Sequence, residues 1–412
     1  MKAELDRLMA ERGYDALMVN GPSTDNPVMY YLSNGAKVGE GTILIKKQGQ
    51  PPMLIVNLME RDEAAKSGLE VINVDRYDPR QILNEEKGDR LRAAVRLRET
   101  IFADLGVQGK VALYGRQEQG AALAIANAFN ARANGVQLVG EVYPSIFDVA
   151  WTTKDDEEVR RIRAVGEKTV AVVGSTAEFL QSHRAEGGVL VKRDGSPLTV
   201  GDVKRQIRLW LAEAGLEDPE GVIFAIGRDA GVPHSSGEDR DPIALGKTIV
   251  FDIFPREPGG GYFFDFTRTW CVGFAPPEVE KAYRDVLDTF ETVMAEMRAG
   301  ELCRIYQRRT CELLEARGHP TVMSDPHTQK GYVHSLGHGV GLQVHEPPYF
   351  GDFEGNTDTL APGCVVTIEP GVYYPDDGGF GIRIEDCAWM NPATGRLAVL
   401  ADYSKELVLP LG

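Results

Sequence analysis

Two aspartates in the second half of the chain stand where apolar residues would be expected. Asp252 interrupts the β-prone run KTIVFDIF, and Asp265 interrupts the run YFFDFTRTW that follows the glycines at 259–261. The glycines predict a turn and the two runs predict a β-hairpin, across which the two carboxylates can meet. Buried carboxylates at such a distance repel each other, so one must stay neutral unless a cation lies between them. The flanking Phe251 and Phe264 make exposure of both aspartates on an edge strand the weaker alternative.

A second pair of acids has the same character. Glu369 ends the apolar run CVVTIE before a Pro-Gly turn, and Glu385 lies in GIRIEDCAWM, which we expect to be one strand. Residues i and i+2 of a strand point to the same side, so Arg383 is expected to share a face with Glu385. The two pairs together supply four carboxylates on apolar strands.

Histidines are concentrated in the same half of the chain. The segment HSLGHGVGLQVHEPP contains His334, His338 and His345, whereas only His183 lies in the first 230 residues. Buried core histidines or a polar surface loop would explain this segment without chemistry, but the four acids favour a metal or proton-transfer site. Carboxylates with an imidazole nitrogen suit Mn, Co, Fe or Zn, whereas a closed structural zinc site would favour thiolates.

The order of these residues resembles the signature of the pita-bread metallopeptidases, a family that includes methionine aminopeptidase, aminopeptidase P and prolidase. The matching motifs are Asp252-x12-Asp265-Phe-Thr-Arg-Thr, His334-Ser-Leu-Gly-His338-Gly, His345-Glu, Glu369-Pro-Gly and Arg383-Ile-Glu385. The resemblance covers about residues 155–412, and the shared order over separated motifs makes it specific. The first 150 residues resemble, more weakly, the creatinase-type domain that precedes this fold in prolidases and aminopeptidase P.

The resemblance implies a centre of two divalent metal ions, which could be Mn, Co, Zn or Fe. Its ligands would be Asp252, Asp265, His338, Glu369 and Glu385. Asp265 and Glu385 would bridge the two ions, and Asp252 would chelate one of them. His338 and Glu369 would complete the other ion. Arg383 would anchor a bridging carboxylate through a hydrogen bond.

The same resemblance implies roles in substrate binding and catalysis. His345 would hydrogen-bond the substrate or the tetrahedral intermediate, and His234 would face the scissile bond. With Glu369, which would carry a proton to the leaving nitrogen, these are the expected catalytic residues. His334 and Tyr373 are the expected substrate-binding residues.

The implied activity is hydrolysis of an Xaa-Pro bond in a proline-containing peptide. A strict dipeptidase needs a cation for the free carboxylate of its substrate, but the run from His345 to Phe350 contains no basic residue. We therefore expect an aminopeptidase P-like enzyme for longer peptides, with Tyr349 and Phe350 as an aromatic rim; an Xaa-Pro dipeptidase (prolidase) is the alternative. A metal-free creatinase-like hydrolase and a non-catalytic binding protein are less favoured, because both predict loss of ligands that are present. Methionine aminopeptidase is disfavoured because it lacks a creatinase-like domain.

Positioning these residues requires more than one domain, as a chain of 412 residues allows. Residues 1–150 alternate short β-rich runs with helical segments, which predicts a small α/β domain. In residues 151–412, apolar residues at helical spacing predict helices between the acid-bearing strands. These helices are expected at 154–182, from Thr199 onwards, at 276–300 and at 303–318. The expected fold class is α+β, with a pita-bread catalytic domain of antiparallel sheet and covering helices after the smaller α/β domain.

Composition restricts the partners and the location. The net charge of −16 argues against binding to nucleic acid, which requires clustered Lys and Arg. The longest apolar runs fall short of the roughly 20 residues that a membrane span needs. The amino-terminal run MKAELDRLMAERGYDAL predicts an amphipathic helix and not a signal peptide, so we expect a cytoplasmic protein.

The remaining cysteines and histidines are assigned no chemistry. The five cysteines follow no CxxC spacing and are expected to be reduced. His183, His319 and His327 match no position of the family signature and are predicted to lie on the surface. The amino-terminal domain has apolar segments but no site of its own, so we expect it to contribute to a homodimer.

Overall fold

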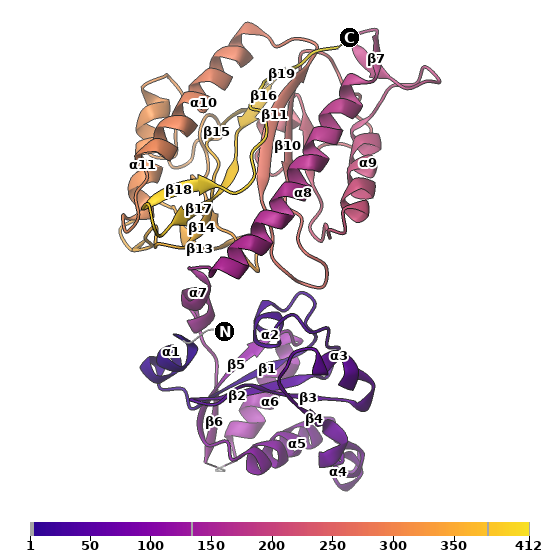
Figure 1. The fold of residues 1–412 in the computed structure, drawn as a ribbon, viewed down its shortest axis with the longest axis vertical. Helices are drawn as coiled ribbons and strands as arrows, with labels where there is room; N and C mark the ends of the chain where they lie inside the picture. Colours follow the sequence, from indigo (N-terminus) through magenta and orange to yellow (C-terminus); the bar gives the residue numbers. More distant parts are fainter. Residues whose placement is uncertain (1–3, 133–134, 377–378, 412) are drawn as a thin grey trace. The chain divides into compact units, whose positions relative to one another are not determined.

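The computed structural model describes residues 4–132, 135–376 and 379–411, which form two compact units (Figure 1). Unit 1 comprises Met1–Ala150 with Gly259–Gly261, and unit 2 comprises Trp151–Pro258 with Tyr262–Gly412. Within the described ranges, no helix is both long enough and apolar enough to cross a membrane.

Unit 1 is built on a six-stranded sheet with the strand order β4-β3-β2-β1-β5-β6. Its strands are β1 (Ala16–Asn20), β2 (Ile43–Lys47), β3 (Met53–Val56), β4 (Glu70–Asn73), β5 (Gly109–Gly115) and β6 (Val136–Val139). The sheet is mixed, because β1 pairs antiparallel with β2 and parallel with β5. The β-rich runs of the sequence predict these six strands, and the expectation of an α/β unit is confirmed.

Helices cover this sheet through aromatic and aliphatic contacts. The helices of this part of the chain are α1 (Glu4–Arg12), α2 (Pro27–Leu32), α3 (Arg61–Ala65), α4 (Pro79–Glu85), α5 (Arg90–Leu105), α6 (Gln119–Asn130) and α7 (Ile146–Trp151), with 3-10 turns η1 (Leu58–Glu60) and η2 (Val74–Tyr77). Phe102 of α5 and Phe129 of α6 meet edge to face, with ring centroids 5.6 Å apart. Both rings pack with Ala16 and Met18, which share a face because they are two residues apart on β1.

Unit 2 contains a four-stranded sheet of order β19-β11-β10-β9, a five-stranded sheet of order β13-β12-β14-β17-β18, and the pairs β15-β16 and β7-β8. The strands are β7 (Arg184–Glu186), β8 (Val189–Val191), β9 (Ile223–Ile226), β10 (Thr248–Ile253), β11 (Phe266–Val272), β12 (His338–Gly339), β13 (Glu346–Tyr349), β14 (Val365–Ile368), β15 (Gly371–Tyr374), β16 (Phe380–Arg383), β17 (Asp386–Asn391), β18 (Arg396–Val399) and β19 (Val408–Leu409). The antiparallel pairing of β10 with β11 confirms the predicted hairpin.

The four helices predicted for residues 151–412 are confirmed. They are α8 (Asp156–Gln181), α9 (Val200–Glu213), α10 (Pro277–Glu296) and α11 (Cys303–Glu315), and a 3-10 turn η3 (Asp229–Gly231) precedes β10. A capping box of Thr199 and Asp202 starts α9. In Figure 1, α8 and α9 lie beside β11 and β9, whereas α10 and α11 lie beside β16 and β13. The expected combination of antiparallel sheet and covering helices is therefore present.

One glycine brings α8 close to the strand that carries the acids. A Cβ atom at Gly166 would lie 2.4 Å from the ring of Phe264, so only glycine permits this distance between helix and strand. Phe264 directly precedes Asp265 in the chain. The packing of α8 therefore fixes the backbone next to one of the candidate ligands.

Candidate metal centre

The β10–β11 hairpin brings the two aspartates close together. Asp252 of β10 lies opposite Thr267 of β11, so these two side chains share a face. Asp265 directly precedes β11, where burial and the charges of Glu385 and Asp252 raise its pKa. The edge-strand alternative is wrong, because β10 lies between β9 and β11. Asp252 is 8% exposed and Asp265 is 4% exposed, so both carboxylates are withdrawn from solvent.

The two glutamates enter the same region from the other sheets. Glu369 directly follows β14, and its peptide N–H donates to the carbonyl of Leu336 at 2.8 Å. Glu385 lies between β16 and β17, so the single strand predicted for GIRIEDCAWM is wrong: these residues form two strands. The physical reason is that the chain leaves one sheet and enters another here. At this point Glu385 makes an isolated bridge with Thr267, and its N–H donates to the Thr267 carbonyl at 3.1 Å.

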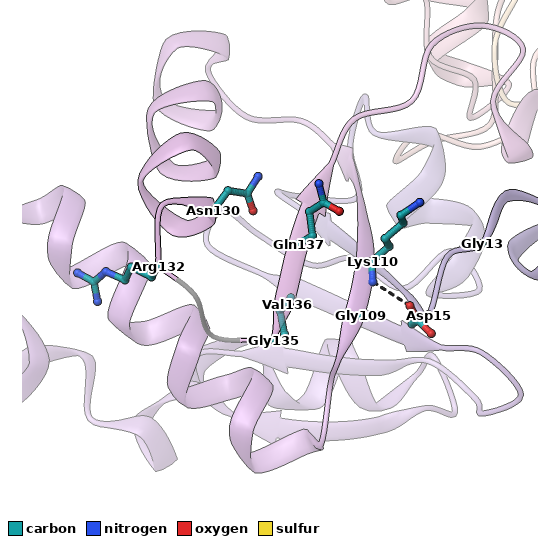
Figure 2. A pocket seen from close by; sticks show the side chains of 9 residues that line it. All are labelled: Gly13, Asp15, Gly109, Lys110, Asn130, Arg132, Gly135, Val136 and Gln137. Atoms are coloured by element: carbon teal, nitrogen blue, oxygen red, sulfur yellow. Dashed lines mark hydrogen bonds between the residues drawn. The ribbon is translucent and has the colours of Figure 1, made fainter.

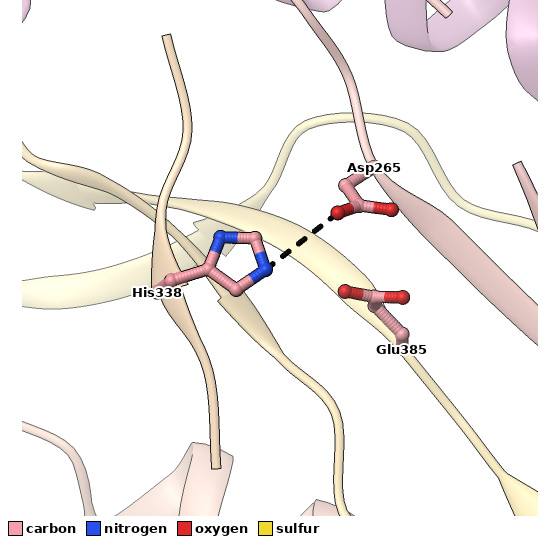
Figure 3. A group of neighbouring side chains, drawn as sticks. All are labelled: Asp265, His338 and Glu385. Carbon is pink, nitrogen blue, oxygen red and sulfur yellow. Dashed lines mark ion pairs between the residues drawn. The ribbon is translucent and has the colours of Figure 1, made fainter. Parts of the chain in front are cut away.

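An imidazole completes a compact set of potential ligands. Figure 3 shows the side chains of Asp265, His338 and Glu385 facing one another. Each offers a ligand atom within 4.8 Å of the others. Nε2 of His338 lies 3.6 Å from Oδ2 of Asp265 and 3.4 Å from Oε1 of Glu369. The other ring nitrogen, Nδ1, lies 3.1 Å from the carbonyl of Gly339, to which it can only donate. The proton is therefore on Nδ1, and the lone pair of Nε2 points toward the acids, as a metal ligand requires.

Several carboxylate oxygens of this set have no hydrogen-bond donor among the described residues. Among the described residues, one oxygen each of Asp252, Asp265 and Glu385 is buried without a hydrogen-bond partner. Burial raises the pKa of Asp265 and of Glu385, and the neighbouring carboxylates raise these pKa values further. Burial also lowers the pKa of His338 to about 4, which keeps its ring neutral. Carboxylate oxygens without donors beside a neutral imidazole fit a divalent cation, so the residues present are compatible with a divalent metal site.

Arg383 connects the acids to the expected substrate residues. Its Nη2 donates to Oδ2 of Asp252 at 2.5 Å, and its Nη1 donates to the hydroxyl of Tyr373 at 2.8 Å. The resemblance implies that Arg383 anchors a bridging carboxylate, whereas its guanidinium bonds to Asp252, the expected chelating residue. Strand geometry explains this, because Arg383 ends β16 and Glu385 lies beyond the end of that strand.

His334 and Tyr373 form one chain of hydrogen bonds. Nδ1 of His334 donates to the carbonyl of Ser335 at 2.7 Å, so Nε2 accepts from the Tyr373 hydroxyl at 3.0 Å. Burial lowers the pKa of His334 to about 3, in keeping with a neutral ring. Tyr373 is fully buried, and its hydroxyl accepts a hydrogen bond from Arg383 and donates one to His334.

The two remaining catalytic candidates are exposed. His345 packs its ring edge-on against His338, with ring centroids 4.2 Å apart. His234 lies on the loop between η3 and β10, where the preceding carbonyl, that of Pro233, accepts from Nη1 of Arg383 at 3.3 Å. Both imidazoles are therefore accessible to a bound molecule. His345 contacts the candidate ligand His338, and His234 follows the residue whose carbonyl accepts from Arg383.

Two threonines that the sequence analysis left without a role support the acids. The hydroxyl of Thr267 donates to Oε2 of Glu385 at 2.7 Å. The hydroxyl of Thr367 donates to Oε1 of Glu369 at 3.4 Å. Each threonine stands two residues from an acid along the chain, so strand alternation could have indicated a shared face.

Two surface predictions are wrong. His319 is buried, because the end of α11 and Tyr374 of β15 enclose it: Nδ1 accepts from the Tyr374 hydroxyl at 2.7 Å, and Nε2 donates to Asp285 at 3.2 Å. Phe350 is fully buried in the core of unit 2 and does not belong to an aromatic rim. His327 is exposed and His183 is partly exposed. All five cysteines are free and buried, as expected.

A hollow of about 490 Å³ in unit 1 does not resemble a reaction site (Figure 2). It is lined by Gly13, Asp15, Gly109, Lys110, Asn130, Arg132, Gly135, Val136 and Gln137. Its polar side chains are used locally: Asp15 accepts from the Lys110 N–H, and Asn130 bonds both peptide groups of Leu138. Its described lining residues include no histidine beside the acid Asp15, so we assign this hollow no chemistry.

Comparisons with known proteins agree with this geometry. Residues 160–392 match metallopeptidase family M24. A probable dipeptidase PepE of Mycobacterium bovis is 30% identical over 233 residues, 57% of this chain and 54% of that protein, so the match spans about half of its length. An Xaa-Pro dipeptidase of Pyrococcus furiosus is 24% identical over 393 residues, 94% of each chain.

Solved structures show the same fold over nearly the whole chain. An X-Pro aminopeptidase from Thermotoga maritima superimposes with a TM-score of 0.74 at 22% identity, covering 97% of this chain and 99% of that one. A prolidase from Pyrococcus furiosus gives a TM-score of 0.72 at 22% identity, covering 97% and 100%. With its pita-bread fold and its matching family segment, this chain belongs to metallopeptidase family M24.

Proposed function

We propose that this protein is a metal-dependent exopeptidase that hydrolyses the Xaa-Pro bond at the amino terminus of peptides, as an aminopeptidase P does. One observation supports this above all: the buried carboxylates of Asp265 and Glu385 each keep an oxygen without a hydrogen-bond donor, and both cluster with the imidazole of His338. The proposed ligands of two divalent ions, of Mn, Co, Zn or Fe, are Asp252, Asp265, His338, Glu369 and Glu385.

Divalent ions in such a site lower the pKa of water and polarise a carbonyl oxygen. The chain supplies the groups that orient the peptide and move its protons. Glu369, whose Oε1 lies 3.4 Å from Nε2 of His338, is the proposed carrier of a proton to the leaving nitrogen. His345 and His234, both exposed, can donate to the carbonyl oxygen of the scissile bond. A proline nitrogen has no N–H, so recognition must use these other groups.

The preferred length of the substrate depends on whether a buried side-chain cation is available to bind the free carboxylate of a dipeptide. Arg383 is paired with Asp252, and Lys154 is paired with Glu346 at 2.5 Å, so neither of these buried cations is available for a substrate carboxylate. This favours peptides of three or more residues. Xaa-Pro dipeptidase activity is the second candidate, because the relative that matches 94% of this chain carries that name.

A comparison of kcat/KM for Ala-Pro, Ala-Pro-Ala and Ala-Ala-Ala tests both points. The protein is first stripped with chelator and then reloaded with Mn or Co. We expect hydrolysis of Ala-Pro-Ala only after reloading, and little hydrolysis of Ala-Ala-Ala. A tenfold preference for Ala-Pro, about 1.4 kcal/mol of transition-state binding, would make the protein a dipeptidase. An unchanged rate after exhaustive chelation would overturn the metallopeptidase proposal.

The proposal includes a cytoplasmic homodimer. Unit 1 exposes large apolar side chains, among them Met59, Leu123 and Val142, which are 86%, 61% and 84% exposed. Such side chains on a unit whose described residues include none of the proposed metal ligands suit a contact with a second copy. Light scattering at micromolar concentration should give twice the chain mass, and a fully active monomer would contradict this part.

A further inference from the structure

Arg268 is a buried arginine that has no assigned role in the proposed hydrolysis. It lies on β11 in the run Asp265-Phe-Thr-Arg-Thr and is fully buried. A guanidinium cannot lose its charge, so burial requires an acceptor for each of its five N–H groups and a countercharge. The acceptors therefore show which parts of the chain Arg268 holds in place.

Each of the five donors has an acceptor. Nε donates to the carbonyl of Ser404, Nη1 to those of Thr267 and Glu385, and Nη2 to Asp386 Oδ1 and the carbonyl of Tyr403, over distances of 3.0, 3.0, 2.8, 2.7 and 2.8 Å. Four of the five acceptors are main-chain oxygens. Arg268 therefore fixes backbone positions and leaves no donor for a substrate.

The backbone that it fixes carries the candidate bridging carboxylates. Glu385 lies between β16 and β17, where regular ladder bonds are interrupted. Its N–H donates to the Thr267 carbonyl, and its own carbonyl accepts from Arg268. Its Oε2 accepts from the Thr267 hydroxyl, and Thr267 follows Asp265 by two residues. One guanidinium thus joins the segment of Asp265 to the segment of Glu385.

The surroundings of Arg268 hold the guanidinium in place. Its Cζ lies 4.0 Å from the ring centroid of Phe266, the residue next to Asp265. Asp386 is fully buried and provides the countercharge, and Nζ of Lys405 lies 2.7 Å from the second oxygen of this carboxylate. Lys405 therefore shares the Asp386 charge without reaching the backbone oxygens that Arg268 binds.

We propose that Arg268 is a positioning residue for the metal centre: by clamping the Thr267 and Glu385 carbonyls and the Asp386 carboxylate, it sets the separation of the Asp265 and Glu385 carboxylates. This inference rests on the proposed function, because it assigns a role toward the ions of that site. A buried ion pair that only stabilises the fold is the competing explanation. The two differ in whether metal affinity changes in a folded protein.

The test compares a variant that loses the guanidinium group of Arg268 with a variant that loses a neighbouring positive charge. Arg268→Lys keeps the positive charge but removes the planar fork, whereas Lys405→Met removes a charge beside Asp386 and keeps the fork. Affinity for Mn or Co is measured by calorimetry on chelated protein, and the fold is checked by circular dichroism and urea unfolding. We expect Arg268→Lys to weaken metal binding at least tenfold, as changes behind metal ligands do, and Lys405→Met to stay within about twofold of wild type.

Each result decides the matter. Wild-type metal affinity in folded Arg268→Lys, with only a loss of stability, would overturn the positioning role and leave the proposed function intact. Equal losses in both variants would also overturn it, because charge alone would then explain them. Should Arg268→Lys not fold, Asp386→Asn, which removes the countercharge at Nη2 of Arg268 and the charge beside Lys405, decides when compared with Lys405→Met: a threefold loss of affinity beyond that of Lys405→Met supports the role and no such loss refutes it. A wild-type protein that binds no metal refutes both proposals.

Discussion

Arg383 and Asp252 form a buried ion pair, with Nη2 of the arginine 2.5 Å from Oδ2 of the aspartate. The other end of the same guanidinium donates to the hydroxyl of Tyr373 and to the carbonyl of Pro233, the residue before His234. A single side chain thus ties a candidate metal ligand to a buried tyrosine and to the loop of a candidate catalytic histidine. The planar five-donor geometry of arginine allows these contacts at once.

Arg383→Lys should therefore lower kcat/KM on Ala-Pro-Ala by about 10- to 100-fold, because an ammonium cannot reach all these acceptors. Steady-state kinetics at saturating metal measures this effect. Arg228→Lys is the matched control, since Arg228 lies at the start of η3 and its side chain is 68% exposed. Equal kinetics of the two variants would contradict the role assigned to Arg383.

Asp265→Asn and Glu385→Gln should each abolish activity and reduce bound metal, because each replaces an anionic proposed ligand of the clustered site with a neutral amide. Metal content after gel filtration and residual hydrolysis are the two measurements. Asp402→Asn serves as control, because its side chain is 77% exposed. Full metal content in both ligand variants would show that the ions bind elsewhere.

Tyr373→Phe should raise KM for proline peptides about tenfold, because it removes both the donor to His334 and an acceptor of Arg383. Tyr374→Phe is a close control. Consecutive residues of β15 point to opposite faces, and the Tyr374 hydroxyl bonds to His319 instead. The comparison of KM and kcat for both variants shows whether the chain from Arg383 to His334 positions the substrate.

Stability should fall on mild acidification because of His319. Burial lowers the pKa of this histidine, and the hydrogen bond to Asp285 only partly opposes the effect. Below the ordinary histidine pKa of about 6.5, the unfolded chain takes up a proton that the folded chain does not, so the free energy of unfolding decreases as the pH falls. The contribution cannot exceed about 1.4 kcal/mol per pH unit.

Urea unfolding of wild type and His319→Gln between pH 7.5 and 5 checks this prediction. The glutamine can replace both hydrogen bonds but does not titrate. We expect the stability difference between the two proteins to change with pH in favour of the variant at the acidic end. A difference that stays constant over this range would mean that His319 has the same pKa in the folded and unfolded states.

Several elements could be predicted from residue patterns because the pattern itself is local. Helices α8 to α11 follow from apolar residues at helical spacing, and the start of α9 follows from its capping box at Thr199. The hairpin of β10 and β11 follows from two β-prone runs around the glycines. These patterns involve only residues close together in the sequence, so they can be recognised without knowledge of the fold.

The end of the GIRIEDCAWM run and the burial of His319 could not be predicted in this way. The run divides into two strands because its halves pair with different sheets, and only the completed topology supplies those partners. His319 is enclosed by Tyr374, which lies 55 residues further along the chain. Phe350 is buried for the same kind of reason, since aromatic residues suit a rim and a core equally well until their neighbours are known.

The sequence by itself determined the types and order of the candidate ligands, because acids on apolar strands and a histidine-rich run are chemical facts of the chain. Only the tertiary structure decided how they meet. It aimed Nε2 of His338 at the acids by bonding Nδ1 to a carbonyl, and it paired Arg383 with Asp252. It also enclosed Arg268 among five acceptors drawn from three segments of the chain. The hydrogen bonds of Arg383 to Asp252 and of Arg268 to Glu385 join residues more than 100 positions apart. They depend on how the strands that carry these residues are oriented relative to one another, and no local sequence pattern encodes that orientation.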